Sequence, residues 1–224
     1  MTSQQAASDM AEAMRALQEA GLNNGTSGNI SVRTGDGMLI TPTGIASDKL
    51  RPDMMVPMRF DGQWDHALRP SSEWSMHAAI YEAYPQAAAV VHAHPDHCVA
   101  LSSLRRPLPA FHYMIASFGG DDVPCSAYEP FGSPELGAAA VVALKGRNAC
   151  LLANHGMICH GADLASATAR AVKLETLARQ YFLACSIGSP VLLGADEMGA
   201  VKVRYRTYGQ QDGAALRQVG ATSA

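Results

Sequence analysis

The sequence predicts an α/β fold, in which helices pack against a mainly antiparallel sheet, and three observations support this prediction. The chain has 224 residues, of which 48% are hydrophobic, and this is enough to bury a substantial core within one domain spanning 1–224. Apolar runs of strand length alternate with longer segments rich in helix formers. Two of the short runs, 30–32 and 38–40, flank Gly35-Asp36-Gly37, a sequence typical of the turn in an antiparallel hairpin.

Apolar side chains recur at helical spacing at the start of the chain, before Gly21, a residue type that commonly follows the last turn of a helix. Residues 25–29 then contain two glycines among Asn, Thr and Ser, which predicts a loop before the hairpin. The run 56–60 and the turn residues Asp61-Gly62 predict a further antiparallel strand. The residues that recur at this spacing and predict an amphipathic helix are Met10, Ala13, Met14, Leu17 and Ala20.

Two apolar runs farther along the chain end in histidine. The run 87–91 predicts a strand that ends at His92-Ala93-His94, and a helix is expected directly after it. The run 149–153 predicts another strand, which ends at Asn154-His155-Gly156. Each of these strands therefore delivers imidazole side chains at its end.

Two further helices are predicted on either side of these strands. Ser71 or Ser72, as an N-cap before Glu73, begins a segment rich in Ala and other helix formers. Residues 164–187 form a long segment of mostly helical character. Only the tail after Gly213 is expected to be weakly ordered.

The composition excludes two classes of partner. A formal net charge of -3 and a pI near 6.2 leave no basic excess to neutralise a phosphate backbone, so no nucleic-acid partner is expected. The uncharged apolar stretches fall far short of the roughly 20 residues that cross a bilayer, so no membrane partner is expected.

The beginning of the chain and its cysteines predict a location. Residues 1–21 have neither the continuous apolar core of a signal peptide nor the basic character of a presequence. The cysteines are odd in number and never form a CxxC pair, so they are expected to be reduced thiols, mostly in the core, of a cytoplasmic protein. They are Cys98, Cys125, Cys150, Cys159 and Cys185.

His92 and His94 lie two residues apart on an extended segment, so both side chains are expected to project to the same side of it. Two imidazoles can then converge on one ion, and His155, at the end of another strand, is the candidate third donor. Three protein ligands with an open fourth position are typical of a catalytic Zn²⁺. The alternative is that the HxH pair only places two polar residues at the end of a strand.

The chain contains five further histidines outside this pattern, so the presence of a histidine alone does not indicate a metal ligand. Each is expected to be a surface or packed residue rather than a ligand, and His97 is the closest competitor because it follows the HxH pair. They are His66, His77, His97, His112 and His160.

Several polar loops have both a structural and a functional interpretation. On its own, Glu73 is an ordinary first-turn carboxylate that the helix dipole favours. Asn29, Thr43-Gly44 and Ser71-Ser72 are compatible with turns and caps, yet they offer hydroxyl, amide and backbone donors suited to a phosphate. None of these loops has a Walker or Rossmann fingerprint.

In combination, these motifs resemble the class II aldolase/adducin family. The resemblance extends from near residue 8 to Tyr208, and the joint occurrence of five motifs is much more specific than any single one. It implies a single three-layer domain with a central, mainly antiparallel sheet flanked by helices. The five motifs, in the family's order and separations, are Gly28-Asn29-Ile30-Ser31-Val32-Arg33, Thr41-Pro42-Thr43-Gly44, Ser71-Ser72-Glu73, His92-Ala93-His94 and Asn154-His155-Gly156.

The resemblance also implies roles for individual residues. A Zn²⁺ ion would be held by His92, His94 and His155, with Glu73 as a fourth ligand or as a base. Another divalent metal is an alternative to Zn²⁺, because histidine-rich sites do not select strongly among metals by affinity. The phosphate of the substrate would be bound by neutral donors from Gly28, Asn29, Thr43, Gly44, Ser71 and Ser72.

A homotetramer with active sites between subunits is implied as well. Tyr113 matches the position from which a neighbouring subunit supplies a proton donor, although a tyrosine here could also be a plain interface or core residue. The segment 205–209 resembles the family's C-terminal motif, from which Tyr208 would close over the substrate.

The activity that the resemblance implies is reversible cleavage of a ketose 1-phosphate to dihydroxyacetone phosphate and a short aldehyde. The candidate substrates are L-fuculose 1-phosphate and the 5-deoxyribulose or 5-methylthioribulose 1-phosphates of nucleoside salvage. Glu73 favours an aldolase over a sugar-phosphate 4-epimerase, because epimerases on this scaffold carry Asp after the Ser-Ser pair. A dehydratase or decarboxylase stays open, whereas a non-catalytic adducin-like interaction domain would lack the three histidines.

Overall fold

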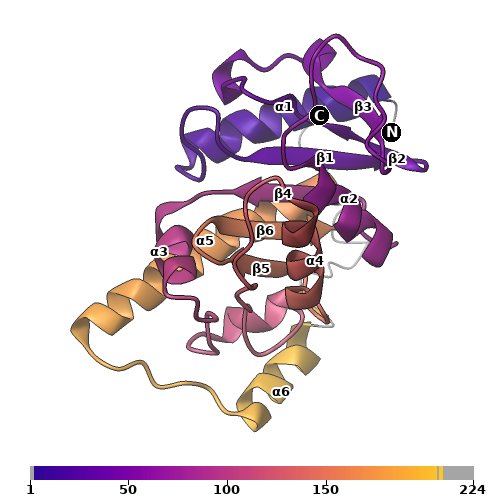
Figure 1. Cartoon of the computed structure of the whole chain (residues 1–224). Coiled ribbons are helices and arrows are strands. Elements are labelled where there is room, and N and C mark those ends of the chain that lie inside the picture. Colours follow the sequence, from indigo (N-terminus) through magenta and orange to yellow (C-terminus); the bar gives the residue numbers. More distant parts are fainter. Residues whose placement is uncertain (1–2, 206, 209–224) are drawn as a thin grey trace, which may run out of the picture.

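A computed structural model describes residues 3–205 and 207–208 of the chain (Figure 1). Six strands form one sheet in the order β3-β2-β1-β4-β6-β5, and every neighbouring pair of these strands is antiparallel. The expected mainly antiparallel sheet is therefore confirmed. The strands are β1 (Asn29–Thr34), β2 (Gly37–Ile40), β3 (Val56–Arg59), β4 (Ala89–Ala93), β5 (Ala149–Leu152) and β6 (Gly156–Gly161).

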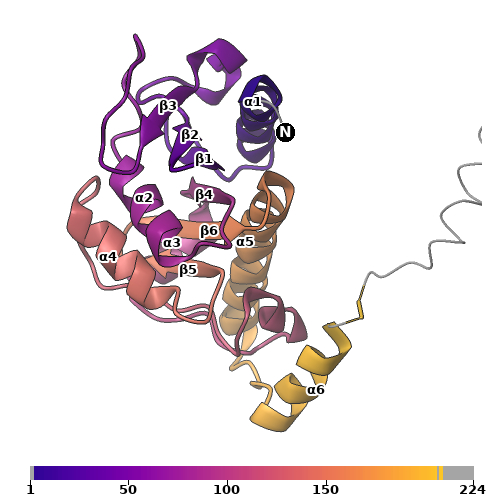
Figure 2. The same ribbon diagram turned by 90° about the vertical axis from the view of Figure 1, so that its right-hand side faces the viewer.

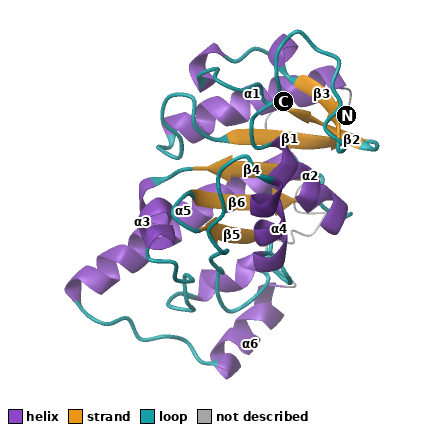
Figure 3. Cartoon of the chain, in the orientation of Figure 1, coloured by secondary structure: helices purple, strands orange, loops and turns teal. Residues whose placement is uncertain are grey.

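Helices cover both faces of the sheet, as the ribbon coloured by secondary structure shows (Figure 3). In the side view, α1 and α5 lie on one face, and α2 and α4 lie on the other (Figure 2). The α-helices are α1 (Ser3–Glu19), α2 (Trp74–Ala83), α3 (Asp96–Ser103), α4 (Pro134–Ala143), α5 (Leu164–Ile187) and α6 (Ala195–Tyr205). Three short 3₁₀ helices are η1 (Ser47–Lys49), η2 (Pro52–Met54) and η3 (Tyr113–Phe118).

Two separate hydrophobic clusters make the three layers. Successive residues of a strand point to opposite faces, so Val91 joins the cluster beneath α1 and α5, while Val90 joins the cluster beneath α2 and α4. Both residues are fully buried, since β4 lies in the interior of the sheet with neighbours on each side. The expected three-layer arrangement is confirmed.

The predicted hairpin forms between β1 and β2, with Thr34 opposite Gly37 at its tip. Gly35 has a φ of 59°, a conformation that costs glycine little. The initial helix, the strands near 56–60, 87–91 and 149–153, and the helix after the HxH pair are also present. The long helix predicted at 164–187 has those bounds, and Asp163 and Ser166 form a capping box at its start.

Two predicted element ends are wrong by a few residues, and both lie at the site. Helix α2 begins at Trp74 rather than at Ser71-Ser72, because these residues form a turn in which the Trp74 amide donates to the Ser71 carbonyl. Strand β4 continues to Ala93, so His92 lies within the strand instead of after it. The backbone of β4 at His92 pairs with β1 on one side and with β6 on the other.

Three elements have no clear signal in the sequence. Helix α4 is apolar on most sides, β6 is buried along its whole length, and Met198 is the one buried residue of α6, so none shows the one-sided pattern that distinguishes helix from strand. Among the described residues, no helix combines the length and apolar character needed to cross a bilayer. The predicted weakly ordered tail after Gly213 lies outside the described residues.

The cysteines are all free thiols. Cys98, Cys150 and Cys159 are buried, as expected of core residues. Cys125 is half-buried, and Cys185, near the end of α5, is exposed, which differs from a core position.

Candidate metal centre

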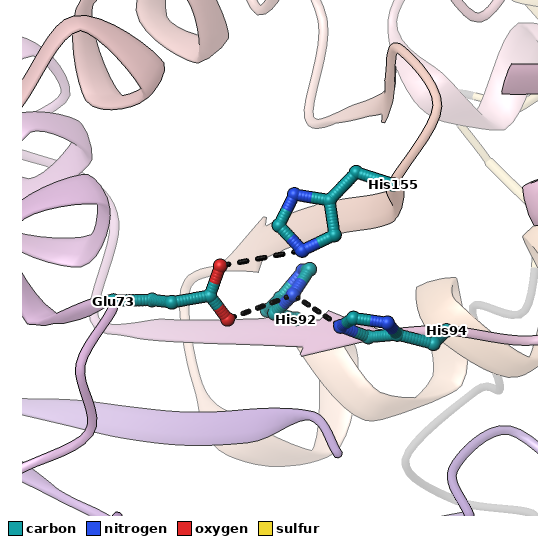
Figure 4. Close-up of side chains that lie close together, drawn as sticks. All are labelled: Glu73, His92, His94 and His155. Atoms are coloured by element: carbon teal, nitrogen blue, oxygen red, sulfur yellow. Dashed lines mark hydrogen bonds and ion pairs between the residues drawn. The ribbon is translucent and has the colours of Figure 1, made fainter. Parts of the chain in front are cut away.

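Four side chains from three parts of the chain converge beside the middle of the sheet (Figure 4). His92 projects from β4 and His94 follows directly after that strand. His155 lies in the turn that joins β5 to β6, and Glu73 is the N-cap residue of α2. One potential ligand atom from each of the four residues lies within 4.8 Å of the others.

The turn at His155 depends on its two neighbours. Asn154 has a φ of 54°, in the left-handed region that asparagine tolerates better than most residues. At Gly156 a Cβ atom would collide with the carbonyl oxygen of Ala93, so a glycine is required for β6 to lie this close to the end of β4. These two positions together bring His155 over the end of β4.

The ligand atoms face one another rather than the solvent. Nε2 of His92 lies 3.0 Å from Oε2 of Glu73 and 2.8 Å from Nε2 of His94. Nε2 of His155 lies 3.3 Å from Oε1 of Glu73. The three imidazole rings have centroid separations of 4.6 to 4.9 Å, so the Nε2 atoms surround one small volume.

The hydrogen bond of His92 shows that this volume suits a cation. Nδ1 of His92 lies 2.8 Å from the backbone oxygen of Met157, and only a protonated nitrogen can donate there. In the neutral ring, Nε2 then carries a lone pair toward a carboxylate oxygen and toward a second imidazole. A proton or a cation between these atoms removes the repulsion between their lone pairs, and one divalent metal can accept donation from all four groups at once.

The titration behaviour of the four groups is consistent with this interpretation. Burial opposes charge on Glu73, yet His92 and, next, His155 and Asn29 bring the pKa of Glu73 well below its usual range. Burial also disfavours a charged His92, but the Glu73 carboxylate outweighs it and raises the pKa of His92. Burial and the charge of His92 lower the pKa of His94 to about 3 and that of His155 to about 4. Both imidazoles are therefore neutral, as metal ligands must be.

A cavity of about 340 Å³ opens beside the four ligands. Its walls are mostly polar and include no Lys or Arg among the described residues. Every position expected to bind phosphate lies in this wall, together with Glu73, His94 and His155; these positions are Gly28, Asn29, Thr43, Gly44, Ser71 and Ser72.

Two asparagines tie the first polar loop to the ligands. Asn29 and His92 are direct partners on neighbouring strands β1 and β4, and the Asn29 amide donates to Oε2 of Glu73 at 2.9 Å. Asn23 accepts a hydrogen bond from the His94 amide at 3.3 Å, and its side chain occupies the space that a Cβ at Gly28 would need. Sequence reasoning did not identify Asn23, because a buried asparagine in a loop carries no motif.

Some other residues of the cavity wall were not predicted from the sequence. Thr26 and Ser27 line the wall next to Gly28 and were not predicted. Tyr128, Glu129 and Phe131, from the segment before α4, also line the cavity. The exposed fraction of Phe131 is 75%, so this residue stands at the mouth of the cavity.

The competing histidines lie elsewhere. His97 forms a hydrogen bond of 2.6 Å with Glu175 and packs against Phe182. His160 stacks on Tyr84. His77 is fully buried beneath Asn29, while His66 and His112 each accept a local hydrogen bond from a backbone amide.

The two candidate tyrosines do not line the cavity of their own chain. Tyr113 is in η3 with about half of its surface exposed, and Tyr208 is 78% exposed. Of the motif 205–209, Arg206 and Gly209 lie outside the described residues. Both tyrosines are thus on the surface, where a second subunit could reach them.

An antiparallel sheet that supports three imidazoles and a carboxylate next to a polar cavity is the arrangement of a metal-dependent enzyme. Comparison with known proteins specifies which kind of metal-dependent enzyme it is. The chain belongs to the class II aldolase family: residues 8–182 match the profile described as Class II Aldolase and Adducin N-terminal domain.

Named relatives are similar over most of their length. A 5-methylthioribulose-1-phosphate/5-deoxyribulose-1-phosphate aldolase of Rhodospirillum rubrum is 47% identical over 88% of this chain and 90% of its own. An L-fuculose phosphate aldolase of Escherichia coli O6:H1 is 46% identical over 86% and 90%. A solved L-fuculose 1-phosphate aldolase superposes with a TM-score of 0.85 at 36% identity, over 88% of this chain and 94% of that structure. The protein is therefore an enzyme, a class II aldolase.

Proposed function

We propose that this aldolase uses Zn²⁺ to cleave a ketose 1-phosphate reversibly into dihydroxyacetone phosphate and a short aldehyde. The observation that carries the proposal is the position of Glu73, whose carboxylate lies next to the three imidazoles and in the wall of the polar cavity of about 340 Å³. Glu73 is the only acid in the four-ligand cluster, so the same group can contact a metal and a substrate carbon.

His92, His94 and His155 would hold the metal, with Glu73 as a fourth ligand or as a free base. When bound, the metal supplies Lewis-acid stabilisation of the negative charge left on the ketose fragment by cleavage, worth several kcal/mol. Neutral imidazoles suit this role because they leave the positive charge of the metal undiminished. Mn²⁺, Co²⁺ or Fe²⁺ could occupy the same donors, and metal analysis of the purified protein decides among them.

Residues of the protein would bind the phosphate and transfer the protons. Gly28, Asn29 and the loops at Thr43-Gly44 and Ser71-Ser72 would bind the phosphate through neutral N–H and O–H donors. A base, for which Tyr113 of a neighbouring subunit is the candidate, would take the C4 hydroxyl proton as the C3–C4 bond breaks, which releases the aldehyde and leaves the bonding electron pair on C3. Glu73 then gives a proton to C3 to complete dihydroxyacetone phosphate, and in synthesis it takes the same proton away.

A neighbouring subunit would complete the site in a homotetramer. Tyr113 would exchange a proton with the aldehyde oxygen, and Tyr208 would close over the substrate, both across a subunit interface. The exposure of both tyrosines supports this arrangement, and so do the exposed apolar side chains of α5. Those side chains include Phe182, Leu183 and Ile187.

The substrate falls within two candidate groups. The named relatives act on L-fuculose phosphate or on 5-methylthioribulose and 5-deoxyribulose 1-phosphates, at nearly equal identity to this chain. Tyr128 and Phe131 at the cavity mouth supply apolar surface that suits a methyl or thioether group as well as lactaldehyde. The five free thiols support a reducing, cytoplasmic location for this chemistry.

A release assay tests the proposal. Dihydroxyacetone phosphate is measured from L-fuculose 1-phosphate, 5-deoxyribulose 1-phosphate and 5-methylthioribulose 1-phosphate in parallel, with zinc-loaded protein. One substrate group is expected to give a much larger kcat/KM than the other. Absence of dihydroxyacetone phosphate from every compound would reject the proposal, and epimerised substrate recovered without release would identify a 4-epimerase instead.

A further inference from the structure

Behind Glu73, a line of hydrogen bonds runs through the interior from the metal centre to Tyr81. The Asn29 amide contacts Oε2 of Glu73 at 2.9 Å, and Nε2 of His77 contacts Oδ1 of Asn29 at 2.6 Å. Nδ1 of His77 contacts the Ser31 hydroxyl at 2.7 Å, and that hydroxyl contacts the Tyr81 hydroxyl at 2.8 Å. All five side chains are buried, and His77 and Ser31 have no exposed surface.

The chemistry of these groups fixes the direction of every bond. Nδ2 of Asn29 donates to the Glu73 carboxylate, so Oδ1 of the same amide faces His77 and must accept. Nε2 of His77 therefore carries the proton. Burial lowers the pKa of His77 to about 3, so the ring is neutral and its Nδ1 can only accept. Ser31 then donates to Nδ1, and Tyr81 donates to Ser31.

This directed chain leaves Asn29 with one free donor. Its oxygen is held by His77 and one of its two amide hydrogens is held by Glu73. The second hydrogen remains, and Asn29 lies in the wall of the cavity. If the amide turned over, its oxygen would face the Glu73 carboxylate, and two acceptors would repel each other at hydrogen-bond distance.

We propose that His77 is a positioning residue of this enzyme: it locks the Asn29 amide so that one nitrogen donates both to Glu73 and to the bound phosphate. The proposal rests on the proposed function for the identity of the anion. Oδ1 of Asn29 selects the tautomer of His77 because it can only accept from Nε2, and the Ser31 hydroxyl then donates to Nδ1. The phosphate end of the substrate and the carboxylate of Glu73 are thereby aligned through a single amide.

A matched set of variants separates positioning from packing. His77→Gln keeps both contacts, since its amide nitrogen can donate to Asn29 while its oxygen accepts from Ser31. His77→Leu fills the space but removes both contacts. Tyr81→Phe removes only the far end of the chain and leaves Ser31 able to donate to His77, so it controls for loss of a buried polar group.

Each zinc-loaded variant is assayed for kcat and KM for the best ketose 1-phosphate, with zinc content and folded fraction measured alongside. His77→Leu is expected to lower kcat by about 10- to 100-fold and to raise KM by about 5-fold, at unchanged zinc content. His77→Gln should recover most of this loss, and Tyr81→Phe should stay within about 3-fold of the wild type. A neutron structure of the wild type should show the proton of His77 on Nε2.

Two results would overturn the proposal. One is a kinetic result: the folded, zinc-loaded His77→Leu enzyme keeps wild-type kcat and KM, or the His77→Gln enzyme is no more active than the His77→Leu enzyme. The other is a neutron structure with the His77 proton on Nδ1. Because the tautomer is read without substrate, a wild type that releases no dihydroxyacetone phosphate would reject the proposed function while the assignment of His77 is still tested.

Discussion

The two carboxylate oxygens of Glu73 have different surroundings. Oε2 accepts from Asn29 and lies 3.0 Å from His92, so it is held from two sides. Oε1 is buried, receives no hydrogen bond and lies 3.3 Å from Nε2 of His155. A buried oxygen without a hydrogen-bond partner raises the free energy of the folded state. A metal ion or a substrate proton is the kind of partner that would remove this penalty.

Changing Glu73 to Gln should separate chemistry from metal binding. The amide keeps the shape of the side chain but cannot take or give a proton at C3, so kcat for cleavage should fall by about 10²- to 10⁴-fold. Fold and zinc content should be retained, because three imidazoles remain. Circular dichroism, metal analysis and the release assay check these points, and unchanged turnover would remove Glu73 from the mechanism.

Changing His94 to Ala should abolish the metal site. Three imidazoles surround the proposed metal position, and removal of one leaves too few donors for tight binding of Zn²⁺. The variant should be purified with little zinc and should lack aldolase activity. His97→Ala is the matched control, because His97 contacts Glu175 rather than the cluster; zinc retained in His94→Ala would refute the assignment.

At the scale of elements, α3 is held at its start by a carboxylate from another helix. Pro95 precedes α3 and has no side chain that can cap it. Glu175 of α5 accepts instead from the amides of His97, at 3.2 Å, and Cys98, at 3.1 Å, and these are two of the amides that a helix start leaves without partners. Since α3 begins two residues after His94, this contact also anchors the chain that leaves the candidate metal centre.

Removal of this cap should destabilise the protein measurably. Glu175→Ala leaves two helix amides and His97 without their acceptor, which should lower the free energy of unfolding by about 1–3 kcal/mol. Urea denaturation measures the change. Glu82→Ala is the control, an exposed glutamate of α2 whose loss should shift stability by less than about 0.5 kcal/mol. Equal effects of the two substitutions would contradict the capping role.

At the scale of the whole molecule, buried neutral imidazoles make stability depend on pH. The pKa of His77 falls from 6.5 to about 3 on folding because the ring is buried. Between these values the unfolded chain binds a proton that the folded chain does not, so the free energy of unfolding falls as the pH drops below 6.5. His94 and His155, with pKa values lowered to about 3 and about 4, act in the same direction.

Thermal unfolding from pH 8 to pH 4 should therefore show a midpoint that is steady above pH 6.5 and declines below it. His77→Gln removes one of these titrating groups, so its midpoint should decline less steeply than that of the wild type. A midpoint that rises on acidification, or a slope that the variant does not change, would show that His77 is not buried in the neutral form.

Mixed oligomers test whether active sites lie between subunits. Tyr113→Phe and His94→Ala should each be inactive alone, since the first lacks the proposed proton donor and the second lacks the metal. If Tyr113 serves a neighbour's site, co-refolded mixtures contain sites with an intact metal centre and an intact tyrosine, and they should regain a fraction of wild-type activity. No recovery in verified mixed oligomers would place Tyr113 outside the neighbouring site.

The antiparallel fold followed from local patterns in the chain, because side-chain alternation and turn residues act over a few positions. The hairpin at Gly35 and the helix 164–187 are examples, since glycine tolerates a positive φ and the segment 164–187 consists mostly of residues that favour a helix. Helix α4 and strand β6 escaped this reasoning, because α4 has apolar residues on most sides and β6 is buried along its whole length, so neither shows periodic contrast.

By itself, the sequence identified the four side chains that the structure brings together as a candidate metal centre, since an HxH pair and motifs in family order are properties of spacing. Only the tertiary structure decided which polar residues support them. Asn23, His77 and Glu175 are separated in the sequence from the side chains and amides they hold, by 71, 48 and 78 positions for His94, Asn29 and His97. Hydrogen bonds act over about 3 Å in space irrespective of chain separation, so the packing of strands and helices had to place these groups together.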